Sequence, residues 1–234
     1  MAKDNWHEQG FASEWDESGN VYTNPDRLNQ LSLLASLLAM KKPARLLDLG
    51  VGSAQVEIAI QQQFPDLLKN CEITGIDGSS AMLELAKYNL ERANLNQIKL
   101  VNLDFSDLNT FSFEYSLDAV ICVQALHEVQ HDIKKSLFEW VHNQLSDQGR
   151  FYIFDRFIYT SGIWKEDWRS LWQWLQSDVD VPVMEFDEYE SVYDAKTDHI
   201  AQVSDYVRWL NQTGFECICP YQCFNRALLV ARKV

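Results

Sequence analysis

The chain has 234 residues, of which 47% are apolar, and this length and composition are typical of one globular domain with a substantial core. The formal net charge of -14 argues against nucleic acid and anionic membranes as partners, because most of the surface would repel phosphate groups. No run of about 18 uninterrupted apolar residues is present and the first residues do not resemble a signal peptide, so we expect a cytoplasmic protein.

An N-terminal helical arm over residues 1–43 is expected before the main body of the protein. It contains spaced aromatic residues, followed by a helix predicted from Pro25 to about Met40 with proline at its start. From residue 44 onward, apolar strand-like runs alternate with helical patterns, which is typical of βαβ units and a parallel sheet. The predicted strands span 44–49, 71–76, 98–102, 117–123 and 149–155, and the predicted helices span 54–64, 79–93 and 132–145.

The segment 156–198 departs from this alternation. Tryptophans recur there every four residues, at Trp164, Trp168 and Trp172, and acidic residues follow them. One interpretation is an amphipathic helix that packs its tryptophans on the core, followed by a solvated acidic loop. The other is a lid-like insertion that acts together with Trp15 and Tyr22, and whose aromatic walls and carboxylates favour an aromatic or cationic small molecule. A helix over 203–212 and two strands around 215–219 and 226–231 follow.

The turn after the first predicted strand is the most informative segment, and it reads Asp48-Leu49-Gly50-Val51-Gly52-Ser53-Ala54. A buried strand ends there in a carboxylate and opens into a glycine turn, which presents bare backbone to a nucleotide-like ligand. The turn has no Lys or Arg, so a ligand with an amino group and no phosphates, such as S-adenosylmethionine (SAM), is favoured. The dinucleotide fingerprint fails at Gln55 and a Walker sequence is missing, while a plain structural turn remains an alternative.

The next predicted strands also end in polar side chains, at the sheet edge where ligands bind in such folds. The second delivers Asp77-Gly78-Ser79, whose carboxylate can accept hydrogen bonds from both ribose hydroxyls. The third delivers Asp104 and Phe105, a carboxylate and an aromatic ring suited to adenine, and the fourth ends at Val123, shortly before His127. Each acidic residue alone is compatible with a turn or a helix cap. Their agreement over consecutive units favours one shared site.

These motifs, in this order, resemble the class I SAM-dependent methyltransferases, particularly their small-molecule branch. The matching residues are 46–52, 75–77, Asp104, 117–120, 126–128, 145–149 and 210–215. The resemblance implies an α/β fold with a doubly wound, mostly parallel, seven-stranded Rossmann-like sheet whose last strand is antiparallel. It also implies a SAM site in which Asp48, Gly50 and Gly52 hold the methionine end, Asp77 the ribose, and Asp104 with Phe105 the adenine, with Met82 against the ring and Gly78, Ser79 and Val123 at the same edge.

Two departures from the family pattern are visible. Ala54 replaces the third glycine of the turn motif, which we interpret as tolerable because this residue already begins the helix. Residues 65–70 lengthen the connection between the first two strands, and we expect a surface loop there.

The sequence from His127 to His131 matches the HExxH pattern of zinc metalloproteases, which requires both histidines on one face of a helix. The strand-like run before it, and Asp132 as the expected N-cap of the following helix, argue against one continuous helix. Histidines that merely decorate a loop remain an alternative, as does a zinc hydrolase with Glu139 or His142 as third ligand. The five cysteines do not complete a metal set either, so no metal is predicted.

Methyl transfer mainly requires the donor and the acceptor to be aligned at roughly 3–3.5 Å with water excluded. If the acceptor loses a proton, one base helps, and His127 is the best-placed candidate because histidine titrates near neutral pH. The predicted function is transfer of the SAM methyl group to an oxygen, nitrogen or carbon atom of a small molecule. A non-catalytic SAM or nucleoside binder is the first alternative.

Overall fold

The structure is a computed structural model that describes residues 10, 21–159, 162–177, 179–193 and 199–234. The first half of the described chain contains α2 (Arg27–Lys41), β1 (Arg45–Leu49), α3 (Gln55–Gln63), α4 (Pro65–Lys69), β2 (Glu72–Asp77), α5 (Ser80–Arg92), β3 (Lys99–Asn102) and the short 3-10 helix η1 (Phe105–Thr110). The second half contains β4 (Leu117–Val123), η2 (Leu126–Glu128), α6 (His131–Gln144), β5 (Leu145–Arg156), η3 (Gly162–Trp164), α7 (Lys165–Gln176), α8 (Phe186–Tyr193), α9 (Val203–Gln212), β6 (Phe215–Cys223) and β7 (Arg226–Lys233).

The seven strands form one sheet in the order β3-β2-β1-β4-β5-β7-β6. The first five strands of this order pair in parallel, and β7 runs antiparallel to both β5 and β6. The predicted doubly wound sheet with an antiparallel last strand is therefore confirmed. Parallel strands of this kind place their carboxyl ends along one edge, and this edge positions the site described below.

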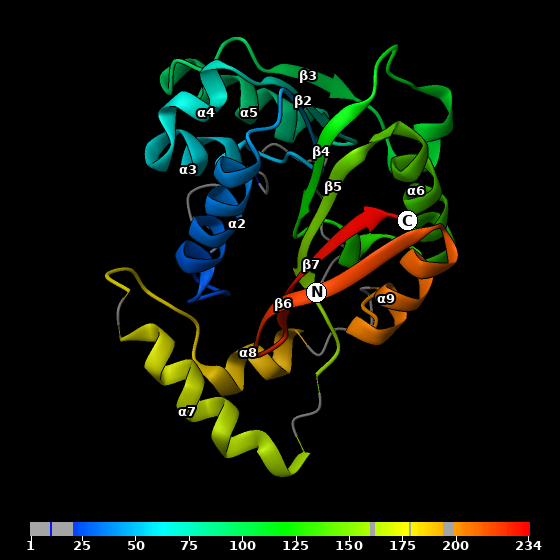
Figure 1. Cartoon of the computed structure of the whole chain (residues 1–234). Coiled ribbons are helices and arrows are strands. Elements are labelled where there is room, and N and C mark those ends of the chain that lie inside the picture. Colours follow the sequence, from blue (N-terminus) through cyan, green and yellow to red (C-terminus); the bar gives the residue numbers. More distant parts are fainter. Residues whose placement is uncertain (1–9, 11–20, 160–161, 178, 194–198) are drawn as a thin grey trace.

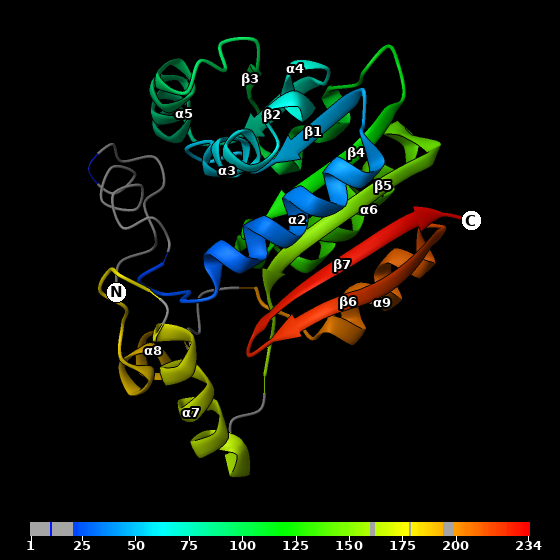
Figure 2. The ribbon, with the colours of Figure 1, turned by 60° about the vertical axis from the view of Figure 1, so that its left-hand side comes forward.

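Helices cover both faces of the sheet (Figures 1 and 2). On one face α2, α3 and α5 pack their apolar side chains on β1 and β2, with Leu34, Leu38 and Ile60 at most 1% exposed. On the other face α6 and α9 pack on β4, β5 and β7 through side chains that include Phe138, Tyr206 and Leu210. The central strands β1, β2 and β4 are buried on both faces, which explains why they read as continuous apolar runs, whereas the edge strands β3 and β6 are more exposed.

The start of α3 differs from the expectation. Ala54 does not begin the helix: it precedes α3 as its N-cap with φ 65° and ψ 27°, in the left-handed region. This conformation is the one that the family glycine adopts freely, and alanine adopts it at a cost of about 1 kcal/mol. Ala54 is fully buried, so the packing of its methyl group helps to hold the residue there.

Three other boundaries also differ. The expected loop over residues 65–70 contains α4, because Pro65 starts a helical turn and Leu68 is buried completely. Helix α6 begins at His131 with Gln130 as its N-cap, so Asp132 lies inside the first turn. Leu145 belongs to β5 rather than to the preceding helix, and the register between β4 and β5 shifts near the start of that strand.

The described part of segment 156–198 contains α7 and α8, which lie beyond the sheet edge in Figures 1 and 2. Trp172 is 3% exposed and packs with Phe186, Tyr189 and Phe224 of the β6–β7 turn in a separate apolar cluster. Trp164 and Trp174 are exposed. Trp172 is therefore buried, but in a cluster separate from the two clusters that line the sheet. Tyr22 accepts a hydrogen bond from the Met184 amide (2.7 Å), whereas Trp6, Phe11 and Trp15 lie outside the described residues.

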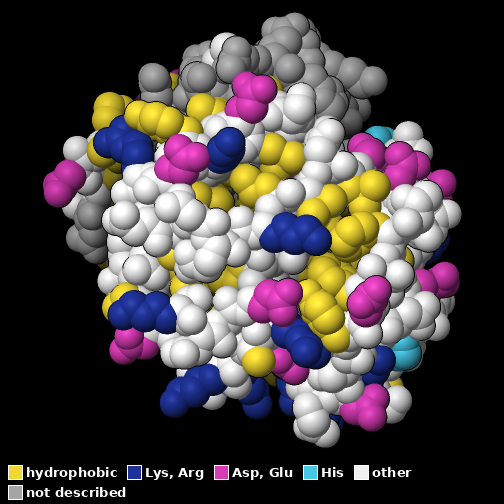
Figure 3. Space-filling model, turned by 90° about the horizontal axis from the view of Figure 1, so that it is seen from above, with side chains coloured by type: hydrophobic (Ala, Val, Ile, Leu, Met, Phe, Trp, Pro, Cys, Tyr) yellow, Lys and Arg dark blue, Asp and Glu magenta, His cyan; other side chains and the backbone are white. Residues whose placement is uncertain are grey.

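Charges of both signs are mixed on the face of the molecule shown in Figure 3, with apolar patches between them. The negative net charge is therefore not concentrated on that face. Among the described residues, no helix combines the length and the apolar character needed to cross a membrane.

Candidate functional site

The glycine turn after β1 packs tightly against the loops that follow β3 and β4. A Cβ atom added at Gly50 would lie 2.5 Å from the Ala125 Cβ and 3.5 Å from the Phe105 ring. Gly50 also has φ +79°, so both the backbone conformation and the space require glycine. The turn therefore joins three strand ends through close contact at one residue.

Asp77, at the end of β2, ties the first two strand ends together. Its Oδ2 accepts a hydrogen bond from the Gly52 amide (2.9 Å), and its Oδ1 accepts one from the Ser79 amide (2.8 Å). The Ser79 hydroxyl in turn caps α5 by accepting from the Met82 amide (3.2 Å). The Met82 methyl group lies 3.9 Å from where a Cβ on Gly52 would be. This network fixes the Asp77 carboxylate at the sheet edge.

Asp104 follows β3 and faces the turn after β2. Its Oδ1 caps η1 by accepting from the Ser106 amide (2.8 Å) and hydroxyl (2.6 Å). Its Oδ2 would lie 3.2 Å from a Cβ on Gly78, so the two loops are in close contact. The structure thus brings Gly50, Gly52, Asp77, Gly78, Asp104 and Phe105 together at one edge.

Asp48 lies deeper than these residues. It is 0% exposed and forms a side-chain hydrogen bond with Glu57 of α3, which is also 0% exposed. Burial, followed by the charge of Glu57, raises the pKa of Asp48 well above its ordinary value, and burial also raises the pKa of Glu57. The pair therefore retains a proton at a pH where exposed carboxyls are ionised. Val123 is buried in the apolar cluster under the same face.

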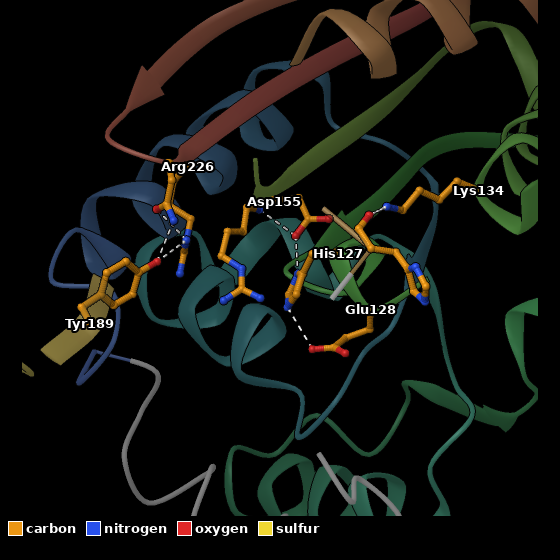
Figure 4. A network of polar contacts seen from close by, with 9 residues as sticks. His127, Glu128, Lys134, Asp155, Tyr189 and Arg226 are labelled. Atoms are coloured by element: carbon orange, nitrogen blue, oxygen red, sulfur yellow. Dashed lines mark hydrogen bonds and ion pairs between the residues drawn. The ribbon is translucent and has the colours of Figure 1, made fainter. Parts of the chain in front are cut away.

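His127 lies in η2 and forms a short contact with Asp155, the penultimate residue of β5 (Figure 4). The distance from His127 Nδ1 to Asp155 Oδ1 is 2.6 Å, and the same oxygen accepts from the Arg156 amide (2.8 Å). Burial alone raises the pKa of Asp155, but the charge and the hydrogen bond of His127 outweigh it and hold the pKa below its ordinary value. The other ring nitrogen, Nε2, lies 3.4 Å from a Glu128 oxygen. An ionised carboxylate therefore orients the imidazole.

The HExxH geometry is not formed. His127 belongs to η2 and His131 is the first residue of α6, so the two histidines do not share one helical face. His131 Nε2 lies 3.1 Å from the His199 carbonyl oxygen, which also accepts a hydrogen bond from Lys134 Nζ. Within the part of the chain that the structure describes, no three His, Cys, Asp or Glu side chains are grouped as metal ligands.

Several residues near the site were not singled out from the sequence. Asp155 and Arg156 follow the apolar run Phe151–Phe154, and this change from apolar to charged residues is a signal that marks the fifth strand end. Glu57 and Arg27 carry no such signal, because a charged residue on an amphipathic helix normally indicates a solvated face. Both are buried here, at 0% and 4% exposure.

The comparison with protein families matches residues 46–149 to the family described as a methyltransferase domain. No curated protein matches the chain in sequence. A solved structure from Nostoc punctiforme PCC 73102, provisionally described as an O-methyltransferase, is 18% identical with a TM-score of 0.69 and covers 100% of this chain. This chain spans 64% of the length of that protein.

Two similar structures contain S-adenosylhomocysteine (SAH), the product left when SAM loses its methyl group. DhpI in complex with SAH is 16% identical with a TM-score of 0.64, over 96% of this chain and 92% of its own. Magnesium protoporphyrin IX methyltransferase from Synechocystis PCC 6803 is 13% identical with a TM-score of 0.61, over 89% and 84% of the two chains. Residues 46–149 therefore match the methyltransferase-domain family, and the chain shares the fold of these solved structures.

Proposed function

We propose that this chain transfers the methyl group of SAM to a small-molecule acceptor. The observation that carries the proposal is the convergence of three strand ends, in which Gly50 contacts the loop of Phe105 and Gly52 donates to Asp77. The methyltransferase domain match spans these residues, and two structures of the same fold contain SAH.

In the proposed cofactor site, the chain binds SAM along the carboxyl edge of β1, β2 and β3. The Asp77 carboxylate accepts the ribose hydroxyls, because two backbone amides already hold its oxygens in place. Asp104 and Phe105 frame the adenine with Met82 on the other side, while Gly78, Ser79 and Val123 complete the edge. The methionine end lies at the glycine turn above Asp48, where a cationic ammonium favours ionisation of the buried carboxyl pair.

When bound, SAM supplies a methyl group on a positively charged sulfur. In its neutral form, His127 accepts the acceptor's proton at Nε2, because Asp155 at 2.6 Å keeps the ring hydrogen on Nδ1; Glu128, 3.4 Å from Nε2, then faces the protonated nitrogen. Asp155 is thus a positioning residue for His127. The acceptor atom is an oxygen, nitrogen or carbon that loses a proton as it gains the methyl group.

We propose that the segment 156–198 forms a lid-like insertion over the acceptor, within one methyltransferase domain over 1–234. Its apolar cluster around Trp172 and Phe224 supports an aromatic acceptor. The cationic alternative has less support, because two of its carboxylates already form ion pairs, Glu190 with Lys165 (2.6 Å) and Asp187 with Arg169 (2.7 Å). Exchange of 156–198 for a homologous segment is expected to change acceptor choice and leave SAM affinity unchanged.

Calorimetry with SAM and SAH on the purified protein tests the cofactor proposal directly. We expect binding of both, and at least a tenfold weaker Kd in Asp77→Ala, because loss of a hydrogen bond to a charged group removes about 1.5–3 kcal/mol. Incubation with radiolabelled SAM and a panel of hydroxylated and amino compounds then tests transfer. Lack of any heat with SAM contradicts the proposal, and binding without turnover on every compound favours the non-catalytic alternative.

A further inference from the structure

Two arginines face each other across neighbouring strands beside the proposed acceptor position. Arg156 ends β5 and Arg226 begins β7, and the two residues are direct partners in the antiparallel ladder. Direct partners extend their side chains from the same face of a sheet. Both are nearly buried, at 3% and 5% exposure. Like charges placed in this way repel each other: burial and the charge of Arg226 lower the pKa of Arg156, while Tyr189, Asp155 and Glu128 act in the opposite direction.

The described surroundings of Arg226 hold it in place without neutralising it. Its Nη1 donates to the Asn225 side-chain oxygen (2.7 Å) and to the Tyr189 hydroxyl (3.1 Å), and Asn225 donates to the same hydroxyl (2.7 Å). These partners are uncharged. Its buried Nε has no hydrogen-bond partner, and no carboxylate of the described residues lies within ion-pair distance. The guanidinium is therefore oriented and retains donors for a ligand.

A third arginine adds positive charge on the same face. Arg27 of α2 is 4% exposed, and its Nε and Nη1 have no hydrogen-bond partner. Burial, followed by the charge of Arg226, lowers the pKa of Arg27 to about 10, while Asp48 acts in the opposite direction. Arg27 thus lies between the carboxyl pair under the glycine turn and the arginine pair. The positive charge extends from the cofactor side toward the acceptor side.

The arginine pair lies beside the proposed base. The Arg156 amide and His127 share Asp155 Oδ1, and the charge of Arg156 also helps to lower the pKa of Glu128, after His127 and against the effect of burial. In Figure 4, Arg226 and Tyr189 lie on one side of His127 and Lys134 lies on the other. An acceptor that extends along this edge of the sheet can then place an anionic group at Arg226 and a second group at His127.

We propose that Arg226, with Arg156 beside it, binds an oxyanion of the methyl acceptor, so that the acceptor is a carboxylate, phosphonate or phosphate carrying a second group that receives the methyl. This inference rests on the proposed methyltransferase function and specifies its substrate class. A planar guanidinium matches such oxyanions by two parallel hydrogen bonds. The methionine carboxylate of SAM has the same chemistry, and the experiment separates the two sources.

The test uses the full chain saturated with SAH, and benzoate, methylphosphonate and inorganic phosphate as probes, each titrated by calorimetry. Benzamide is the uncharged match for benzoate. We expect at least one of the three anions to bind. If benzoate binds, we expect its affinity to be about tenfold or more higher than that of benzamide. Arg226→Met is expected to lower the affinity for the bound anion about tenfold and to leave SAH affinity unchanged. Arg226→Lys is expected to recover part of the affinity. Arg232→Met is the matched control, because Arg232 is on the same strand, exposed and paired with Glu216.

Three results overturn the inference: binding of none of the three anions, equal binding of benzoate and benzamide when benzoate is the ligand, or anion binding that Arg226→Met leaves unchanged. If Arg226→Met weakens SAH and not the anion, the methionine carboxylate is the ligand and the inference is also wrong. Should that variant not fold, Tyr189→Phe removes one neutral partner of Arg226 and is expected to weaken the anion severalfold. Absence of SAH binding to the unaltered protein instead contradicts the methyltransferase proposal, and the anion titrations are then read without SAH.

Discussion

Replacement of Asp155 by asparagine tests how the imidazole of His127 is held. Asp155 Oδ1 accepts both from the Arg156 amide and from His127, so the asparagine oxygen can keep this position and only the charge is lost. A hydrogen bond to a charged group contributes about 1.5–3 kcal/mol and a neutral one about 0.5–1.5, so the difference is about 1–1.5 kcal/mol. We therefore expect kcat to fall about tenfold. Asp155→Ala removes the acceptor itself, and we expect a fall of about 10²-fold, similar to His127→Ala.

The assay is SAH release with an acceptor found in the compound panel, measured over a range of pH, with SAM affinity measured in parallel. SAM affinity is expected to stay unchanged. The double variant with His127→Ala should be no slower than His127→Ala alone. The reasoning is refuted if both Asp155 variants keep the original kcat while His127→Ala loses activity, or if the two effects add.

Three further predictions concern stability and the cofactor edge. Glu57→Gln is expected to raise Tm, and to raise it more at pH 8 than at pH 4. The pKa of the Glu57 carboxyl is raised in the folded protein, so its ionisation at higher pH destabilises the fold by about 1.4 kcal/mol for each pH unit by which the pKa is raised. A Tm difference that does not depend on pH contradicts this reasoning. Gly50→Ala is expected to lower the free energy of unfolding by about 2 kcal/mol or more and to weaken SAH binding at least tenfold, because the added Cβ lies 2.5 Å from the Ala125 Cβ. Gly10→Ala is the control, because no heavy atom lies within 4 Å of the added Cβ, and it is expected to match the original protein in calorimetry and melting. Trp172→Ala removes a buried indole that donates a hydrogen bond to the Met184 carbonyl (2.8 Å). We expect the local stability of this cluster to fall by about 3–5 kcal/mol, which faster proteolysis within α7 and α8 would reveal. An unchanged cleavage rate argues against a separately packed cluster.

The sheet was predictable because its central strands are buried on both faces and their apolar runs are bounded by polar turns. Ser79 illustrates the local signals that worked, since it caps α5 as the sequence indicates. The left-handed Ala54 was not predictable from alanine's preferences, because the tertiary packing of a buried methyl group outweighs a local backbone preference. Residues 65–70 were misread since a five-residue helix has too little periodicity to show.

The site was predictable in part for a similar reason. Carboxylates at consecutive strand ends converge by topology alone, so Asp77 and Asp104 could be placed next to glycine turns without coordinates. The partner of His127 could not be named in this way, because its identity depends on the distance between the loop after β4 and the end of β5. The role of Arg226 could not be predicted from the sequence either, because its position opposite Arg156 depends on how β7 pairs antiparallel with β5.

The position of β7 has a consequence for the order in which the sheet forms. β6 is made before β7, yet its described hydrogen-bonded neighbour in the sheet is β7, which separates it from β5. Until β7 docks on β5, the β6 segment has no ladder to join and has an unpaired edge. Docking of β7 on β5 then creates the template for β6 and places Arg226 at the same time. A chain truncated just before Arg226 would therefore lack both the completed sheet and the proposed anion site.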